Sequence, residues 1–242
     1  MPISLHTNKI KGEKDCFIEE LYKMILNKDE LINGELDNKA TQLHKFYLAI
    51  YIMNHYNKNQ HDSQYLNYLM TSIIESESLF VMGFTNAGMM ALRSALESSF
   101  KFLYYEYHPI ELQLNEIGEF DIKGIDYRSF MYSIPCFKKL NFIMKDEIER
   151  VWNELCKYVH YDISVIKDIS VISDIKPIFN DEGSFNNIKR NVKEVLRIII
   201  IIMFIVSPKW LEEVEKSYFD YVFEVLFKGE EVTNMKISLK IV

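Results

Sequence analysis

The amino-acid sequence predicts an all-α protein, a bundle of about seven helices with a small β accessory. Apolar residues recur at helical spacing through most of the 242-residue chain, as in amphipathic helices. Glycine and proline number only 8 and 5, too few for a disordered chain or a turn-rich all-β fold. Neither G-x-G-x-x-G after a strand nor G-x-x-x-x-G-K-[ST] occurs, which disfavours the parallel-sheet nucleotide-binding folds.

Start and stop signals give the expected helix boundaries. Asn86, Asp146 and Ser184 carry short polar side chains of the kind that cap helix N-termini. Pro109 is expected to end one helix and Pro208 to begin another, because proline fits only the first turn. The expected helices are 14–27, 38–57, a third from Asp62 or Ser63 to 82, 86–108, 147–159, 184–206 and 208–227.

Other segments are expected to break the helical pattern. Residues 110–145 are less regular, with a loop at 116–126 and short helices around Pro135. Residues 163–175 are rich in β-branched side chains, a composition typical of a strand. We expect the 163–175 segment to pair with the C-terminal tail as the β accessory, because the tail alternates Met235, Ile237, Leu239 and Ile241.

Charge and composition limit the classes of partner. The net charge of −7 gives no general basic field, so any nucleic-acid contact needs a local patch. The apolar run Ile198–Val206 is too short for a membrane span, which takes roughly 18 apolar residues, so no membrane partner is expected. Three scattered cysteines without C-x-x-C, and an N-terminus without an apolar leader, favour a cytoplasmic protein with reduced thiols.

No metal or cofactor is expected. His44 and His55 share a helical face but lie three turns apart, too far to hold one ion. No H-E-x-x-H motif or paired carboxylate joins them.

A basic stripe is expected on the sixth helix. Lys189, Lys193 and Arg197 are spaced four apart, with Arg190 beside them. Such a stripe is ordinarily a solvated helix face, and it also suits the phosphates of RNA.

The stretch RSALES, residues 93–98, places two charges on a mostly apolar helix. Arg93 and Glu97 share a narrow polar stripe of the helical wheel with Asn86 and Tyr104. One interpretation is a structural ion pair, because Arg and Glu four residues apart meet on one helix face. The other makes Arg93 an anion holder whose guanidinium Glu97 fixes, since the planar fork of arginine suits oxyanions.

A histidine lies where the fifth expected helix ends. Trp152, Cys156 and His160 are spaced four apart, so His160 falls at the C-terminal end of the buried face of that helix. Histidine transfers protons near neutral pH, and Tyr158 and Asp162 flank it in positions to orient it. The alternative is a packed or capping histidine, whose positive charge complements the last carbonyls of the helix.

These two motifs carry a resemblance to a family. R-S-x-x-E at 93–97, followed by L-x-x-Y-V-H at 155–160, resembles HEPN-like helical domains. The similarity is greatest to uncharacterised bacterial members associated with phage defence and toxin–antitoxin loci. We expect one domain over 1–242, with a HEPN-like core at about 60–205 and the helices 14–57 and 208–227 packed on it. The resemblance implies an all-helical bundle, often dimeric. In active members it implies metal-independent RNA cleavage by an arginine and a histidine at the dimer cleft.

The sequence departs from the active members of that family in one respect. They carry arginine, a polar residue and, a few residues on, the histidine, all on one helix. Here the residues before His160 include no arginine nearer than Arg150, which is too far upstream. RNA cleavage would therefore require Arg93 or Lys157 to replace the missing arginine.

Two functional hypotheses follow. The first is a bacterial defence or toxin-type effector that cleaves RNA without a metal. In it His160 is the general acid and base, Arg93 stabilises the phosphorane-like charge, and Glu97 holds Arg93. The second is a non-catalytic helical module that binds a protein partner or a second copy of itself, with these residues as a buried polar network. In the first, the expected substrate-binding residues are Tyr158, Asp162, Lys157, Asn86 and Tyr104.

Overall fold

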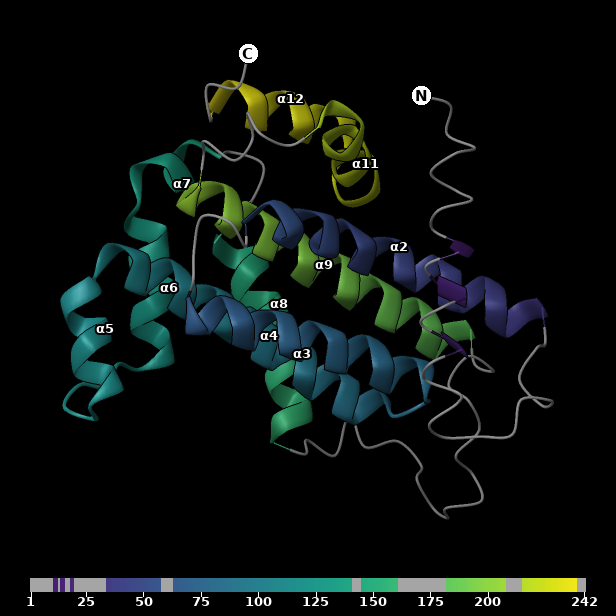
Figure 1. The fold of residues 1–242 in the computed structure, drawn as a ribbon, viewed down its shortest axis with the longest axis horizontal. Helices are drawn as coiled ribbons and strands as arrows, with labels where there is room; N and C mark the ends of the chain where they lie inside the picture. The colour runs from purple at the N-terminus through teal and green to yellow at the C-terminus, as the bar shows by residue number, and fades with distance from the viewer. Residues whose placement is uncertain are drawn as a thin grey trace.

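A computed structural model describes residues 34–57, 63–140, 145–160, 182–207 and 215–238, together with positions 11, 12, 14, 15, 18 and 19. This part of the chain contains helices, turns and short connections and no strand, as Figure 1 shows. The helices are α2 (Gly34–Asn57), α3 (Gln64–Val81), α4 (Thr85–Tyr107), α5 (Pro109–Glu116), α6 (Gly124–Ser133), α7 (Pro135–Lys139), α8 (Lys145–Val159), α9 (Glu182–Val206), α11 (Lys216–Leu226) and α12 (Gly229–Ser238). The expected all-α class is confirmed over these ranges.

Helix α4 lies at the centre of the bundle, in contact with α3, α6, α8 and α9. Its sequence explains this position, because apolar side chains cover most of its surface and Leu92, Leu96 and Phe100 are buried. Gly88 faces the Phe80 ring of α3, and a Cβ atom at position 88 would lie 2.6 Å from that ring. Glycine at 88 therefore lets α3 and α4 pack closely.

The apolar run Ile198–Val206 forms the C-terminal part of α9. All residues from Ile198 to Ile205 are buried, and α9 packs on α2, α4 and α11. The expectation of a core helix is confirmed. None of the described helices is long and apolar enough to cross a membrane.

The expected helices in the described ranges are present, with small changes at their N-termini. Helix α4 begins at Thr85, so Asn86 lies in its first turn instead of at the cap. Asp146 and Ser184 likewise lie in the first turns of α8 and α9. A negative side chain in a first turn still interacts favourably with the helix dipole.

The predicted β accessory is wrong for the part of the C-terminal tail that the structure describes, because this part is helical. Met235 and Ile237 belong to α12. Glu231 stabilises the start of that helix, because its carboxylate accepts the backbone N–H of Lys228 at 2.8 Å, as in half of a capping box. Four alternating apolar residues are too short a pattern to outweigh this start signal. The other half of the accessory, 163–175, lies outside the described residues.

The region 110–145 is more helical than expected. Residues 109–116 form α5, so the expected loop is confirmed only over residues 117–123. Helices α6 and α7 lie on either side of Ile134 and confirm short helices around Pro135. Helix α11 is the described part of the expected last helix. Most of the expected first helix and residues 208–214 lie outside the described residues.

Candidate functional site

The RSALES pair lies between α4 and α8. The Arg93 Nη1 atom donates to the Glu97 carboxylate. The guanidinium carbon of Arg93 also lies 4.1 Å from the ring centroid of Trp152 on α8. Lys101, one turn further along α4, places its Nζ atom 3.0 Å from the other Glu97 oxygen. Both charges of the pair therefore have partners, and the arginine joins two helices.

A second arginine lies over the same tryptophan. The Arg128 guanidinium carbon on α6 is 4.3 Å from the Trp152 ring centroid. Its Nε donates to Glu149 at 3.0 Å and its Nη1 donates to the Gly124 carbonyl at 3.2 Å. The Tyr132 hydroxyl donates to the same Glu149 oxygen at 2.8 Å. Trp152, Arg93 and Arg128 thus connect α4, α6 and α8 through cation–π contacts, which are strongest on tryptophan.

The charges around Glu97 determine its protonation. Burial alone would raise the pKa of the Glu97 carboxyl, but the charges of Arg93 and Lys101 and the hydrogen bonds from both outweigh it. The net result is a pKa below the ordinary value. Glu97 is therefore a carboxylate at neutral pH and serves as a fixed counter-ion, not as a general acid.

His160 lies apart from the Arg93 pair. It is exposed, immediately after the last residue of α8, and its backbone N–H donates to the Cys156 carbonyl at 3.0 Å. Trp152, which contacts Arg93, is eight residues earlier on the same helix, an axial offset of about 12 Å at 1.5 Å per residue. Lys157 lies in the last turn of α8 and is also exposed. Arg93 and Lys157 are the two cations that could replace the arginine of the active family members. Lys157 is the nearer of the two to His160 along the chain.

The expected substrate-binding residues do not share one surface. The Tyr158 side chain is buried, and its hydroxyl accepts from Asn187 of α9 at 3.3 Å. Tyr104 is buried near the end of α4, stacked on His108 with ring centroids 4.0 Å apart. Asn86 lies at the opposite end of that helix. Asp162 lies outside the described residues.

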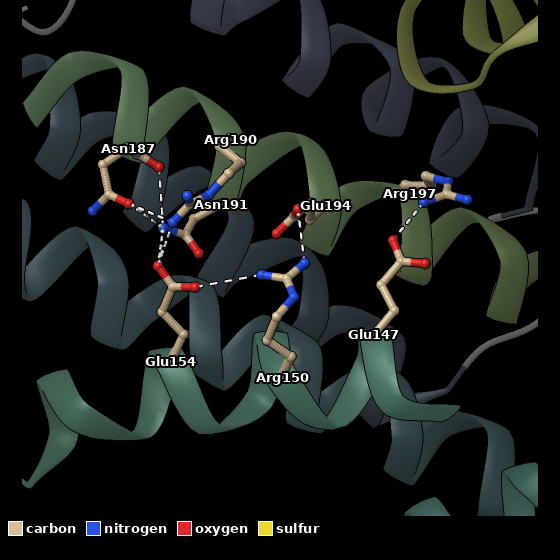
Figure 2. Close-up of polar contacts among 8 residues, drawn as sticks. All are labelled: Glu147, Arg150, Glu154, Asn187, Arg190, Asn191, Glu194 and Arg197. Atoms are coloured by element: carbon tan, nitrogen blue, oxygen red, sulfur yellow. Dashed lines mark hydrogen bonds and ion pairs between the residues drawn. The ribbon is translucent and has the colours of Figure 1, made fainter. Parts of the chain in front are cut away.

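Sequence reasoning missed a row of polar contacts between α8 and α9, drawn in Figure 2. Arg150 pairs with Glu194 at 2.9 Å and with Glu154 at 3.5 Å, and Glu154 also accepts from Arg190 at 2.7 Å. Asn191, fully buried, donates to Glu154 at 3.2 Å. Hydrogen bonding to Glu194 raises the pKa of Arg150 above its ordinary value. Alternating charges three and four residues apart on both helices were the available signal.

The end of this row explains part of the basic stripe. Arg197 contacts Glu147 of α8 and Glu231 of α12, each at 2.6 Å. Lys189 instead donates to Gln42 of α2 at 2.7 Å. The residues of the predicted basic stripe therefore have different partners. Arg197 forms ion pairs with α8 and α12, whereas Lys189 contacts α2.

A second missed group is a buried polar network between α2 and α3. His44 Nδ1 lies 2.7 Å from a Glu77 oxygen, and the Tyr51 hydroxyl donates to the other Glu77 oxygen at 2.5 Å. The Tyr47 hydroxyl lies 2.9 Å from the Ser76 hydroxyl. Burial raises the pKa of both tyrosines well above the ordinary value, and the Glu77 charge adds to this. Polar residues on otherwise apolar helix faces were the only signal, and they do not identify their partners.

Comparison with protein-family models, with the sequences of curated proteins and with solved structures finds no match for this chain. Within the described ranges, no three side chains of histidine, cysteine, aspartate or glutamate gather as metal ligands would.

Proposed function

We propose that this chain is a non-catalytic helical interaction module with a HEPN-like fold, of the kind found in bacterial defence or toxin–antitoxin complexes. The observation that supports this most is the position of Arg93, whose guanidinium is held by the Glu97 carboxylate and the Trp152 ring. In this proposal RSALES fixes the packing of α4 on α8.

The surroundings of Arg93 do not favour an anion. A phosphate at the guanidinium would meet the negative charge of Glu97, to which Arg93 already donates. The Arg93 Nε atom is buried and has no hydrogen-bond partner among the described residues, so it offers no accessible donor. Loss of Glu97 would leave the Arg93 guanidinium without a carboxylate, and loss of Arg93 would leave Glu97 with Lys101 alone. Both effects are those of a structural ion pair.

Exposed apolar side chains support a role in binding another protein. Tyr107, Ile110, Ile117 and Ile125 are all largely exposed and lie on one stretch of the chain, from the end of α4 to the start of α6. Figure 1 shows α5, which carries Ile110, at one end of the molecule. Contiguous exposed apolar patches mark protein-contact surfaces, and in this proposal the four side chains contribute to one such patch.

A second candidate function is RNA cleavage at the C-terminal end of α8. The observation that favours it is that His160 and Lys157 are both exposed within one turn. His160 would take the proton of a ribose 2′-hydroxyl as that oxygen attacks the adjacent phosphorus, and Lys157 would stabilise the developing charge. The proton would then pass to the departing 5′-oxygen, leaving a cyclic phosphate and a free hydroxyl.

One experiment separates these functions. Purified protein is incubated with labelled single-stranded RNA in EDTA, beside Arg93→Ala, His160→Ala and Lys157→Ala, with Lys138→Ala as an exposed-lysine control. We expect no cleavage by any of the five proteins. Cleavage lost in His160→Ala and Lys157→Ala but kept in Arg93→Ala would establish the second candidate. Cleavage lost in Arg93→Ala and His160→Ala, with unchanged thermal melts, would overturn the non-catalytic proposal and assign RSALES to catalysis.

A further inference from the structure

Three lysines come together where α2 lies along α9. The two helices run in the same direction, because Lys39 lies 5.6 Å from the Phe185 ring centroid and Gln42 accepts from Lys189 at 2.7 Å. The next turn of each helix brings Lys45 and Lys193 to the same junction. The Tyr221 hydroxyl of α11 donates to the Lys45 carbonyl at 2.9 Å and fixes the backbone there.

These lysines differ from the other buried or half-buried cations of the described residues. Lys39, Lys101 and Arg197 each lie within ion-pair distance of a carboxylate. No carboxylate of the described residues lies within 4.0 Å of the ammonium groups of Lys45, Lys189 and Lys193. A chain with a net charge of −7 thus holds these three half-buried positive charges without direct counter-ions among the described residues.

The ammonium groups of Lys45, Lys189 and Lys193 repel one another. All three side chains are half-buried. Burial lowers the pKa of Lys45, and the charges of Lys189 and Lys193 lower it further. Burial also lowers the pKa of Lys193; Glu231 opposes this, while Arg197, Lys228 and Lys189 add to the lowering. Like charges held together at some expense of stability are typical of a site whose ligand supplies the opposite charge.

We infer that Lys45, Lys189 and Lys193 bind a phosphate group. A phosphate offers several oxygen acceptors and one or two negative charges, which suits three ammonium groups on two neighbouring helices. The half-buried stems limit the motion of the lysines, so less side-chain entropy is lost on binding than at a fully exposed site. The inference is independent of the proposed function, since it holds whether or not the chain cleaves RNA.

The phosphate has two possible sources, a small phosphate compound and the backbone of single-stranded RNA. Both present the same group to the lysines. They differ in size, since an RNA strand extends along the junction and adds a salt-dependent contribution for each further phosphate contacted.

The test uses a triple variant with a charge-matched control. Lys45→Gln, Lys189→Gln and Lys193→Gln are combined in one full-length chain. The control combines Lys123→Gln, Lys138→Gln and Lys216→Gln, three exposed lysines on other elements, and changes the net charge equally. Thermal melts are recorded in inorganic phosphate and in chloride at equal ionic strength.

We expect phosphate to raise the Tm of the wild type and of the control, by an amount that grows with the phosphate concentration. The Tm of the triple variant should be the same in phosphate as in chloride. In chloride the triple variant should melt at or above the wild type, because the repulsion is relieved. If it fails to fold, Lys193→Gln alone gives the same comparison. An equal phosphate response in wild type and lysine variant would overturn the inference.

Fluorescence anisotropy with a labelled single-stranded RNA distinguishes the sources. Binding weakened about tenfold or more in the triple variant, and unchanged in the control, would assign the phosphate to an RNA backbone. Thermal stabilisation by phosphate without RNA binding would assign it to a small phosphate compound. RNA affinity equal in the triple variant and control, together with an equal thermal response to phosphate, would contradict a phosphate site at this junction.

Discussion

At the scale of single residues, one contact of Arg93 could be predicted from the sequence and another could not. Its spacing from Glu97 predicts the ion pair, because side chains four residues apart meet on a helix. The Trp152 contact could not be predicted, since it depends on how α8 crosses α4. That contact changes the balance between the two interpretations of RSALES, because a guanidinium stacked on an indole is already engaged.

Glu97 gives a prediction of pH dependence at this scale. Its folded pKa lies below the ordinary 4.5 despite burial, so the charged form stabilises the folded state above the unfolded pKa. That stability is lost as pH falls through the lowered pKa. We therefore expect Glu97→Gln to lower the free energy of unfolding at neutral pH, and the difference from wild type to shrink below pH 4.5.

Urea unfolding at several pH values measures this difference. Glu119→Gln, at an exposed position, is the control and should follow the wild type throughout. A difference for Glu97→Gln that stays constant or widens on acidification would show that the carboxylate is not stabilised by its neighbours.

At the scale of helices, the apolar periodicity predicts most of the elements, and the ion-paired faces explain how they are held together. Helix α8 is an example, because its apolar face packs on α4 while Arg150 and Glu154 bind α9. Helix α12 is the contrary case. Its alternating residues indicated a strand, but Glu231, through the Lys228 N–H and Arg197, determines a helix. The contact with Arg197 joins distant elements and is absent from any local pattern.

The α3–α4 contact gives a prediction at this scale. The new Cβ of Gly88→Ala would meet the buried Phe80 ring, and such overpacking costs about 1–3 kcal/mol. Alanine recovers about 1 kcal/mol in a helix interior, so we expect a net destabilisation of up to about 2 kcal/mol. The free energy of unfolding from urea titration checks the sign.

Gly124→Ala is the matched control, since its Cβ would lie 3.9 Å from its nearest neighbours, an ordinary contact distance. We expect that variant to be neutral or slightly stabilised. A stabilised Gly88→Ala protein would mean that α3 and α4 are further apart than described.

At the scale of the whole molecule, the all-α class and the buried α9 follow from composition and periodicity alone. The candidate site is less predictable. The sequence singles out Arg93, Glu97 and His160 as candidates, yet only the fold separates His160 from the pair by about two turns of α8. The same fold gathers Lys45 with Lys189 and Lys193, residues far apart in sequence. Charge clusters formed by packing cannot be read from helical spacing within one element.

The most direct test of a structural role for RSALES is the free energy of unfolding of Arg93→Ala, measured in urea beside His160→Ala. Arg93→Ala removes the contact with Trp152 and one partner of Glu97, so we predict a loss of about 1–3 kcal/mol. His160→Ala changes an exposed side chain and should alter the value by less than about 0.5 kcal/mol. If Arg93→Ala unfolds with the wild-type free energy, the guanidinium does not stabilise the α4–α8 packing and a structural role for RSALES is wrong.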